Sequence, residues 1–136
     1  MLRKVSMTFV GMTKSEISMS SGKIDSTFWN ALDSLVRDSE LIVDRPKGSH
    51  HPRYPQITYP VDNGYLENTT SMDGNGIDVW RGSDFAGKLD AIICTVDLKK
   101  KDSEIKLLIV CTRDEKNLII EFHNLNEYMK GLLIER

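Results

Sequence analysis

The sequence predicts an α+β fold that is mainly β, in which a small closed barrel carries a helix packed against its outside. Two runs, 89–96 and 105–111, have apolar residues on both alternating faces, and strands of this kind need cover on two sides. Amphipathic helical patterns stand before and after these strands. At 136 residues and without an internal repeat, the chain is expected to form a single domain.

The first helix is expected from Thr27 onward, with Asp25, Ser26 or Thr27 as its cap. Five apolar residues fall on one face of this helix: Phe28, Trp29, Leu32, Leu35 and Val36. The run 40–43 then indicates a short strand. We interpret residues 1–24 as a flexible leader and residues 25–136 as one folded domain.

All four prolines of the chain fall in the stretch from Pro46 to Pro60, which excludes a regular helix there. A long irregular connection usually carries function. The stretch and its flanks hold donors for an anion, with no acid before Asp62: Arg45, Lys47, His50, His51, Arg53, Tyr54 and Tyr59.

The rest of the chain continues the pattern of short elements. Residues 76–80 indicate a strand that precedes the two apolar runs. Thr112 and Glu115 match a capping box, which predicts a helix from there to about His123. The end, 129–134, could return to the sheet as a further strand. Lys99, Lys100 and Lys101 are typical of a solvated hairpin turn.

The two cysteines are expected to be reduced. If Val96 pairs with Ile105, then Cys94 opposes Leu107, and Cys94 and Cys111 lie about four residues out of register, on the order of 13 Å apart. That distance excludes a disulfide and favours buried thiols in a cytosolic protein.

The charge balance excludes several classes of partner. With 18 basic and 20 acidic residues the net charge is -2, so no global field attracts nucleic acid or an anionic membrane. No segment reaches the length of a membrane span, and no signal peptide is recognisable. We therefore expect a cytoplasmic protein without nucleic-acid or membrane partners, and the sequence leaves a homo-oligomer open.

Acidic residues gather around the ends of consecutive predicted strands: Asp73, Asp78, Asp97, Asp102 and Glu104. Mg²⁺ prefers oxygen ligands and binds through one or two carboxylates together with waters and phosphates. A magnesium and phosphate site is therefore one interpretation of these acids. The other is that Asp73-Gly74-Asn75-Gly76 forms only a turn, which composition alone favours.

The ordered motifs resemble those of the soluble family I inorganic pyrophosphatases, and in particular the short pyrophosphatase-like proteins. The resemblance covers roughly residues 40–112. It is carried by Asp44-Arg45-Pro46, Tyr59-Pro60, Gly64-Tyr65, the segment 73–79, and Asp97 followed by Glu104-Ile105-Lys106.

The resemblance implies a five-stranded OB-like barrel with an N-terminal and a C-terminal helix outside, which binds Mg²⁺ and pyrophosphate or a related phosphoanhydride. It implies metal ligands at Asp73, Asp78 and Asp97, with Asp102 or Glu104 completing the set. Its phosphate-binding positions are Arg45, Tyr59 and Lys106, to which the donor-rich stretch adds Lys47. The positions nearest the chemistry would be Asp73, Asn75 and Asp78.

Two departures from the family pattern bear on catalysis. Asn75 stands where the family has an acid that takes the proton from the attacking water, and an amide can coordinate a metal but cannot act as a base. Asn63 stands where the family has a phosphate-binding tyrosine. Losing a general base typically costs a factor of about 100 to 10,000 in rate.

Three functions are therefore open. The first is an Mg²⁺-dependent inorganic diphosphatase that hydrolyses pyrophosphate to two phosphates with reduced activity. The second is a binding module on the same fold that retains a phosphate or nucleotide pocket without turnover. The third is a single-strand nucleic-acid binder in which Arg53, Tyr54 and Tyr59 stack on bases, and the cluster of acids opposes it.

Overall fold

The computed structural model describes residues 14–71 and 74–136, and side chains from Ser26 onward. The chain divides into two units, residues 1–34 and residues 35–136. Helix α1, Lys14–Arg37, begins well before the expected start at Thr27, so residues 14–24 are helical. The boundary between a flexible leader and a domain at residue 25 stays a prediction. No helix in the described ranges has an apolar run long enough to cross a membrane.

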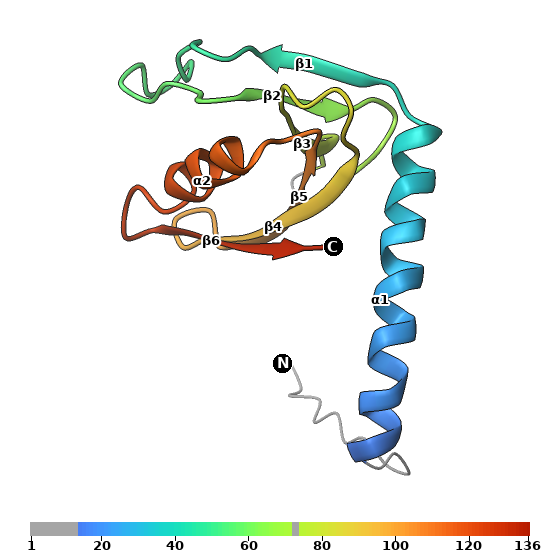
Figure 1. The fold of residues 1–136 in the computed structure, drawn as a ribbon. Helices are drawn as coiled ribbons and strands as arrows, with labels where there is room; N and C mark the ends of the chain where they lie inside the picture. The colour runs from blue at the N-terminus through green and yellow to red at the C-terminus, as the bar shows by residue number, and fades with distance from the viewer. Residues whose placement is uncertain (1–13, 72–73) are drawn as a thin grey trace. The chain divides into compact units, whose positions relative to one another are not determined.

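The second unit is built on one open, mixed sheet with the strand order β1-β2-β3-β5-β4-β6 (Figure 1). All neighbouring strands are antiparallel except β3 and β5, which are parallel. The elements are β1 Leu41–Arg45, β2 Asp62–Leu66, β3 Ile77–Arg81, β4 Leu89–Asp97, β5 Asp102–Ile109, α2 Arg113–Phe122 and β6 Met129–Glu135. The expected five-stranded closed barrel is therefore wrong, because the sheet has six strands and β1 and β6 are its edges.

One face of the apolar strands is buried by α2 and Tyr59, although the sheet does not close into a barrel. The sheet bends around α2, which lies inside the bend (Figure 1). The core on that face combines four sheet residues with Tyr59 of the proline-rich stretch, Ile119 of α2, and two residues that flank strands, Val61 before β2 and Cys111 after β5; the sheet residues are Trp80, Ala91, Ile93 and Leu108. On the opposite face Val96 and Ile105 remain 46% and 44% exposed near the β4–β5 turn. Apolar residues on both faces thus do not require closure in this sheet.

The start of α2 follows the predicted capping box. The Oγ1 atom of Thr112 accepts a hydrogen bond from the backbone N–H of Glu115 at 3.2 Å, and the Glu115 carboxylate accepts from the backbone N–H of Thr112 at 2.8 Å. Glu115 also accepts from the backbone N–H of Ser83 at 3.0 Å. Burial alone would raise the pKa of Glu115, but the hydrogen bonds from Thr112 and Ser83 outweigh it and lower the pKa.

Strand β2 was absent from the sequence prediction. Its centre, Asn63 and Gly64, has low strand propensity. Gly64 is required because a Cβ atom there would lie 1.9 Å from the carbonyl oxygen of Ile42 in β1. The glycine that weakens the sequence signal is thus the residue that lets β1 and β2 approach.

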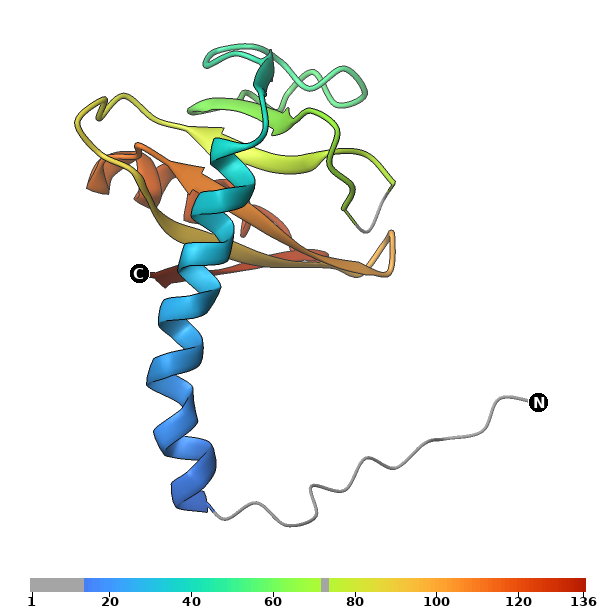
Figure 2. The same cartoon turned by 90° about the vertical axis from the view of Figure 1, so that its right-hand side faces the viewer.

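The predicted register between β4 and β5 was wrong by two residues. Cys94 pairs with Ile105 rather than Leu107, since the hairpin closes between Asp97 and Asp102. The Asp97 carboxylate accepts hydrogen bonds from the backbone N–H groups of Lys99 and Lys100, both at 2.9 Å. This capped turn lies at the opposite end of β4 from the carboxyl terminus of β6 (Figure 2).

Both cysteines are free, which confirms the prediction that they form no disulfide. Cys111 is buried in the core, and burial, with the charges of Glu115 and Asp90, raises its pKa to about 12. Cys94 is only partly buried, which corrects its interpretation as a core residue.

Candidate functional site

One face of the sheet brings together polar side chains from all the strands between β1 and β4. Direct partners across an antiparallel pair point to the same side of the sheet, and residues two apart in a strand share a face. The face that carries Trp80 and Leu108 therefore also carries four cross-strand pairs: Arg45 with Asn63, Tyr65 with Asp78, Ile93 with Lys106, and Thr95 with Glu104.

Lys106 lies at the centre of this face, between two carboxylates. Its Nζ atom is 2.5 Å from Oδ2 of Asp78 and 2.9 Å from Oε2 of Glu104. The side chains of Lys106 and Glu104 are only 13% and 9% exposed, whereas that of Asp78 is 32% exposed. Burial alone would lower the pKa of Lys106, but the two carboxylates outweigh it and raise the pKa, so that Lys106 is a permanent cation.

Tyr59 connects this lysine cluster to β1. Its buried ring packs 6.1 Å from the ring of Trp80 and 5.4 Å from that of Phe122. Burial raises the pKa of Tyr59, while a hydrogen bond from Arg45 acts in the opposite direction and the charge of Asp78 adds to the rise. We call these five residues the inner group: Arg45, Tyr59, Asp78, Glu104 and Lys106.

Asp97 and Asp102 lie away from Lys106, at the end of the β4–β5 hairpin. They are direct cross-strand partners, and Asp97 caps the turn with its carboxylate. Both line an open hollow of about 440 Å³ on the hairpin, together with Val96, Leu98, Lys101 and Ser103. Within this structure Asp97 thus has a local role in the turn.

The expected metal ligands are only partly placed. Asp73 lies outside the described residues. Among the side chains that the structure describes, those of residues 26–71 and 74–136, no three of His, Cys, Asp or Glu lie close enough to hold a metal ion. Asp78 and Glu104 offer the hard carboxylate oxygens that Mg²⁺ prefers, and Mg²⁺ needs only one or two carboxylates when phosphate and water complete its shell. The donor chemistry of Asp78 and Glu104 therefore fits Mg²⁺. In this structure both carboxylates pair with the ammonium group of Lys106.

Asn75 lies in an exposed loop between β2 and β3. Its backbone carbonyl accepts a hydrogen bond from the N–H of Ser71 at 2.7 Å. The left-handed backbone position beside it is taken by Gly74, with φ of +81°. Residue 76 has no room for a side chain, because a Cβ atom at Gly76 would lie 2.7 Å from the carbonyl oxygen of Leu66.

Asp62 anchors the proline-rich stretch, and sequence reasoning missed it. Its carboxylate accepts from the backbone N–H of Lys47 at 2.8 Å and from the guanidinium of Arg81 at 2.9 Å. The hydrogen bond from Lys47 is the largest cause that lowers the pKa of Asp62. The predicted role of the exposed Lys47 side chain in substrate binding stays a prediction. The sequence held one signal for this anchoring role, since Asp62 is the first acidic residue after the donor-rich stretch.

The two adjacent histidines have different partners. Nδ1 of His50 lies 3.2 Å from Oγ1 of Thr58. Nδ1 of His51 accepts hydrogen bonds from the backbone N–H groups of Arg53 and Tyr54, at 3.1 Å and 3.2 Å. His51 therefore organises the loop that carries it.

His123 is a second residue whose role the sequence did not reveal. It is buried, and its Nε2 atom accepts a hydrogen bond from the indole N–H of Trp80 at 3.0 Å. Burial, with a contribution from the charge of Lys106, lowers the pKa of His123 to about 3. His123 is therefore a neutral acceptor that holds Trp80 beneath the inner group.

No family model matches this chain, and no curated protein matches it either. Two solved structures are similar to it. One is an inorganic pyrophosphatase from Helicobacter pylori, with 17% identity and a TM-score of 0.47 over 72% of this chain and 83% of the other. The other is described as an inorganic phosphatase from Anaplasma phagocytophilum, with 16% identity and a TM-score of 0.48 over 70% and 81% of the two chains. These values describe a distant similarity of fold and assign no family.

Proposed function

We propose that the protein is an Mg²⁺-dependent inorganic diphosphatase that hydrolyses pyrophosphate to two phosphates, at a rate reduced by the absence of a carboxylate base. One observation carries the proposal. Four residues that the sequence motifs assign to such a site share one face of the sheet, and a fifth, Tyr59, packs against Trp80 on that face; the four are Arg45, Asp78, Glu104 and Lys106.

The inner group has the chemistry that phosphoryl transfer needs. Charge spreads over the phosphate oxygens in the transition state, and fixed cations stabilise it. Arg45 and Lys106 supply positive charge, and the phenol of Tyr59 supplies a further donor. The raised pKa of Lys106 keeps its charge throughout the neutral range.

The metal ligands in this proposal are Asp73 and Asp78, with Glu104, Asp97 or Asp102 as further candidates. Bound Mg²⁺ would supply a water of lowered pKa, near about 7, and would neutralise part of the phosphate charge. Asp78 and Glu104 are held in position by Lys106 before any substrate arrives. Preorganised charges of this kind cost no reorganisation during the reaction.

Release of phosphate from pyrophosphate in the presence of Mg²⁺ tests the proposal. The variant Asp78→Asn should lower the rate by about 100-fold or more, because it removes a charged ligand. Glu121→Gln is the matched control, since Glu121 is an exposed acid of α2 outside the site, and it should leave the rate unchanged. A wild-type rate no higher than that of Asp78→Asn would contradict the proposal.

A binding module without turnover is the second candidate function. Two observations favour it: the Lys106 ammonium already occupies both described carboxylates, and Asn75 is an amide that cannot act as a base. Calorimetry with pyrophosphate, Mg²⁺ and nucleotides separates the candidates. Tight binding without phosphate release would select the module, and the absence of binding would remove it.

A further inference from the structure

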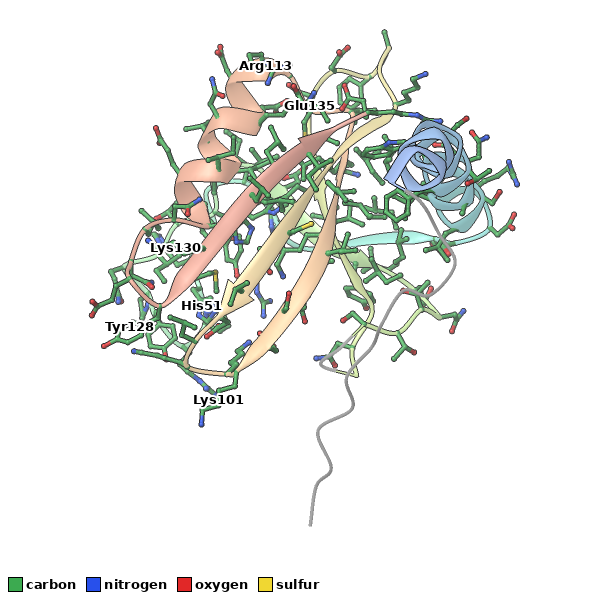
Figure 3. The ribbon with its side chains drawn as sticks, turned by 90° about the horizontal axis from the view of Figure 1, so that it is seen from below. His51, Lys101, Arg113, Tyr128, Lys130 and Glu135 are labelled. Carbon is green, nitrogen blue, oxygen red and sulfur yellow. The ribbon has the colours of Figure 1, made fainter. Side chains whose placement is uncertain are left out.

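The side of the sheet opposite the inner group forms a second distinct surface. Direct partners across antiparallel strands share a face, so Cys94 lies in one row with Ile105 and Leu132. Val96 and Lys130 lie together in the next row toward the β4–β5 turn. We call this side of β4, β5 and β6 the outer face. Figure 3 looks onto these three strands, with Lys130 labelled at the end near the turn.

The outer face is apolar and open to solvent. The hydrogen bond of 2.8 Å from the N–H of Leu98 to the carbonyl of Tyr128 extends its rows by one more step beyond the strands. Large apolar side chains on this face and at its end are between 40% and 65% exposed: Val96, Leu98, Ile105, Tyr128, Leu132 and Ile134. A contiguous exposed apolar surface commonly marks the binding site of a partner.

The charge on the outer face is basic. Among the residues that the three strands contribute to it, Lys130 is charged and none is acidic. The Nζ atom of Lys99 lies 4.3 Å from the centre of the Tyr128 ring. Within the part of the chain that the structure describes, neither lysine forms an ion pair. The complementary partner is therefore apolar with acidic flanks, whereas a second copy of this face would bring only basic groups together.

The edge of β6 beside the outer face is closed to an added strand. The side-chain amide of Asn124 accepts a hydrogen bond from the N–H of Gly131 at 3.3 Å and donates one to its carbonyl at 3.1 Å. Oδ1 of Asn126 accepts from the N–H of Met129 at 3.0 Å. An added strand would need these same backbone groups. A partner therefore lies on the face rather than along this edge.

The dimensions of the outer face match one helix. Three adjacent strands are about 10 Å across, and the rows from Leu98 back to Ile92 extend about 20 Å along the strands. A helix is about 10 Å in diameter, and about 13 of its residues extend 20 Å. The hollow of about 440 Å³ lies at the turn end, where Val96, Leu98 and Lys101 contribute to its lining. A large apolar side chain of the partner fits such a recess.

We propose that the outer face binds an amphipathic helix of a partner protein. The apolar stripe of that helix covers Val96, Ile105 and Leu132, and its acidic residues lie beside Lys99 and Lys130. The inner group lies on the opposite face of the sheet, so this interaction does not depend on the proposed diphosphatase.

Fluorescence anisotropy of a labelled synthetic peptide with the full chain tests the inference. The probe has about 18 residues, which exceeds the length at which isolated helices are marginal. It carries leucines along one side and glutamates beside them, and the control peptide has lysines in place of the glutamates. The acidic peptide should bind with a Kd of about 10 μM and the lysine peptide about tenfold or more weakly. Added salt should weaken the binding.

Two variants of the outer face should weaken binding of the acidic peptide. Leu132→Ser should do so by about tenfold, because Leu132 is 65% exposed in the middle of the face. Lys130→Glu should do so by about fivefold or more, because it reverses a charge. Urea unfolding verifies that both are folded. The matched controls are Leu118→Ser in α2 and Lys88→Glu before β4, both exposed, and they should leave the affinity within about twofold.

Three results of the titrations would overturn the inference: no binding of the acidic peptide, equal binding of both peptides, or an unchanged affinity in both outer-face variants. A dimer in sedimentation velocity that Leu132→Ser dissociates would assign the face to a second copy and reject the helix. Cosedimentation with phosphatidylserine vesicles that Leu132→Ser abolishes would assign it to a membrane and also reject the helix. Phosphate release from pyrophosphate should be unchanged in Leu132→Ser, so the diphosphatase is decided separately.

Discussion

Lys106 and Lys116 are two buried lysines that each bridge two carboxylates, yet they lie in very different surroundings. Lys116 is 7% exposed and contacts Asp90 at 3.0 Å and Glu135 at 3.3 Å. Arg113 also pairs with Glu135, at the opposite end of the sheet from His51 (Figure 3). The same local arrangement thus occurs twice in one small unit.

The difference lies in the carboxylates and in what surrounds them. Both partners of Lys116 are 42% exposed, and together they connect α2 to β4 and β6. Glu104, a partner of Lys106, is 9% exposed, and further donors lie beside the cluster in Tyr59 and Arg45. A lysine between two acids is therefore not evidence of a site by itself. Each cluster has two cations and two carboxylates, so the burial of Glu104 and the phenol of Tyr59 are what distinguish the cluster around Lys106.

The largest expected effect is that of Lys106→Met. This change leaves Glu104 buried without its cation, which should lower the free energy of unfolding by about 3 kcal/mol. Phosphate release should fall by about 100-fold or more, because a cation on the phosphate is lost. Urea unfolding and the phosphate-release assay measure the two effects. A folded variant with normal activity would remove Lys106 from the site.

Acidification should destabilise the protein through His123. The folded pKa is about 3 and the unfolded pKa is about 6.5, so the unfolded state binds more protons between these values. Stability is therefore present above pH 6.5 and is lost as the pH falls toward 3, by about 2 kcal/mol at pH 5. Glu135 and Glu115 have lowered pKa values and contribute losses only at more acidic pH, below about 4.5.

Thermal or urea unfolding between pH 7 and pH 5 measures the combined contribution of His123 and of His51, whose pKa is also lowered, and the part that disappears in a His123 variant belongs to His123. His123→Gln, which keeps an acceptor for Trp80, should flatten the pH dependence in this window. An unchanged slope in the variant would mean that another group titrates there.

Asn75→Asp should increase phosphate release by about tenfold, because it restores a carboxylate where a proton acceptor is expected. We expect the Lys116 cluster to be purely structural, so no substitution there should increase the rate of phosphate release. The control is Asn117→Asp, an exposed position in α2, which should leave the rate unchanged. An unchanged or lower rate in folded Asn75→Asp would show that residue 75 is not near the attacking water.

Lys116→Met should have the smallest effect. It should lower the free energy of unfolding by about 1 kcal/mol, since its carboxylate partners are exposed and Arg113 still neutralises Glu135. Phosphate release should stay within about twofold of the wild-type rate. A loss of activity equal to that of Lys106→Met would mean that the two clusters do not differ in the way proposed.

Local signals in the sequence predicted most of the elements. The capping box at Thr112 predicted the start of α2, and runs that are apolar on both faces predicted β4 and β5 to within a few residues. Strand β2 was missed because Gly64 has low strand propensity. The glycine is there because it lets the backbones of β1 and β2 approach closely. The closed barrel was wrong because cover by α2 and by Tyr59 cannot be distinguished, in a sequence, from cover by a further strand.

The residues of the candidate site could be predicted where they belong to motifs that follow one another in a recognisable order along the chain. Arg45, Tyr59, Asp78, Glu104 and Lys106 were selected in this way and lie together. Other contributions depend on contacts between segments that the sequence does not relate. These include the anchoring role of Asp62 and the acceptor role of His123. The hairpin turn at the three lysines was predicted, whereas the cap that the Asp97 carboxylate forms on this turn was not.

The parallel pairing of β3 with β5 has a kinetic consequence. The β4–β5 hairpin closes over a short capped turn, which is an event of microseconds, whereas β3 must close a loop that contains all of β4 before it pairs. Asp78 and Lys106 lie on opposite sides of that late contact. We therefore expect the face that carries the inner group to assemble after the hairpin during folding. Val79→Ala should then speed unfolding more than it slows folding, which stopped-flow measurements would reveal.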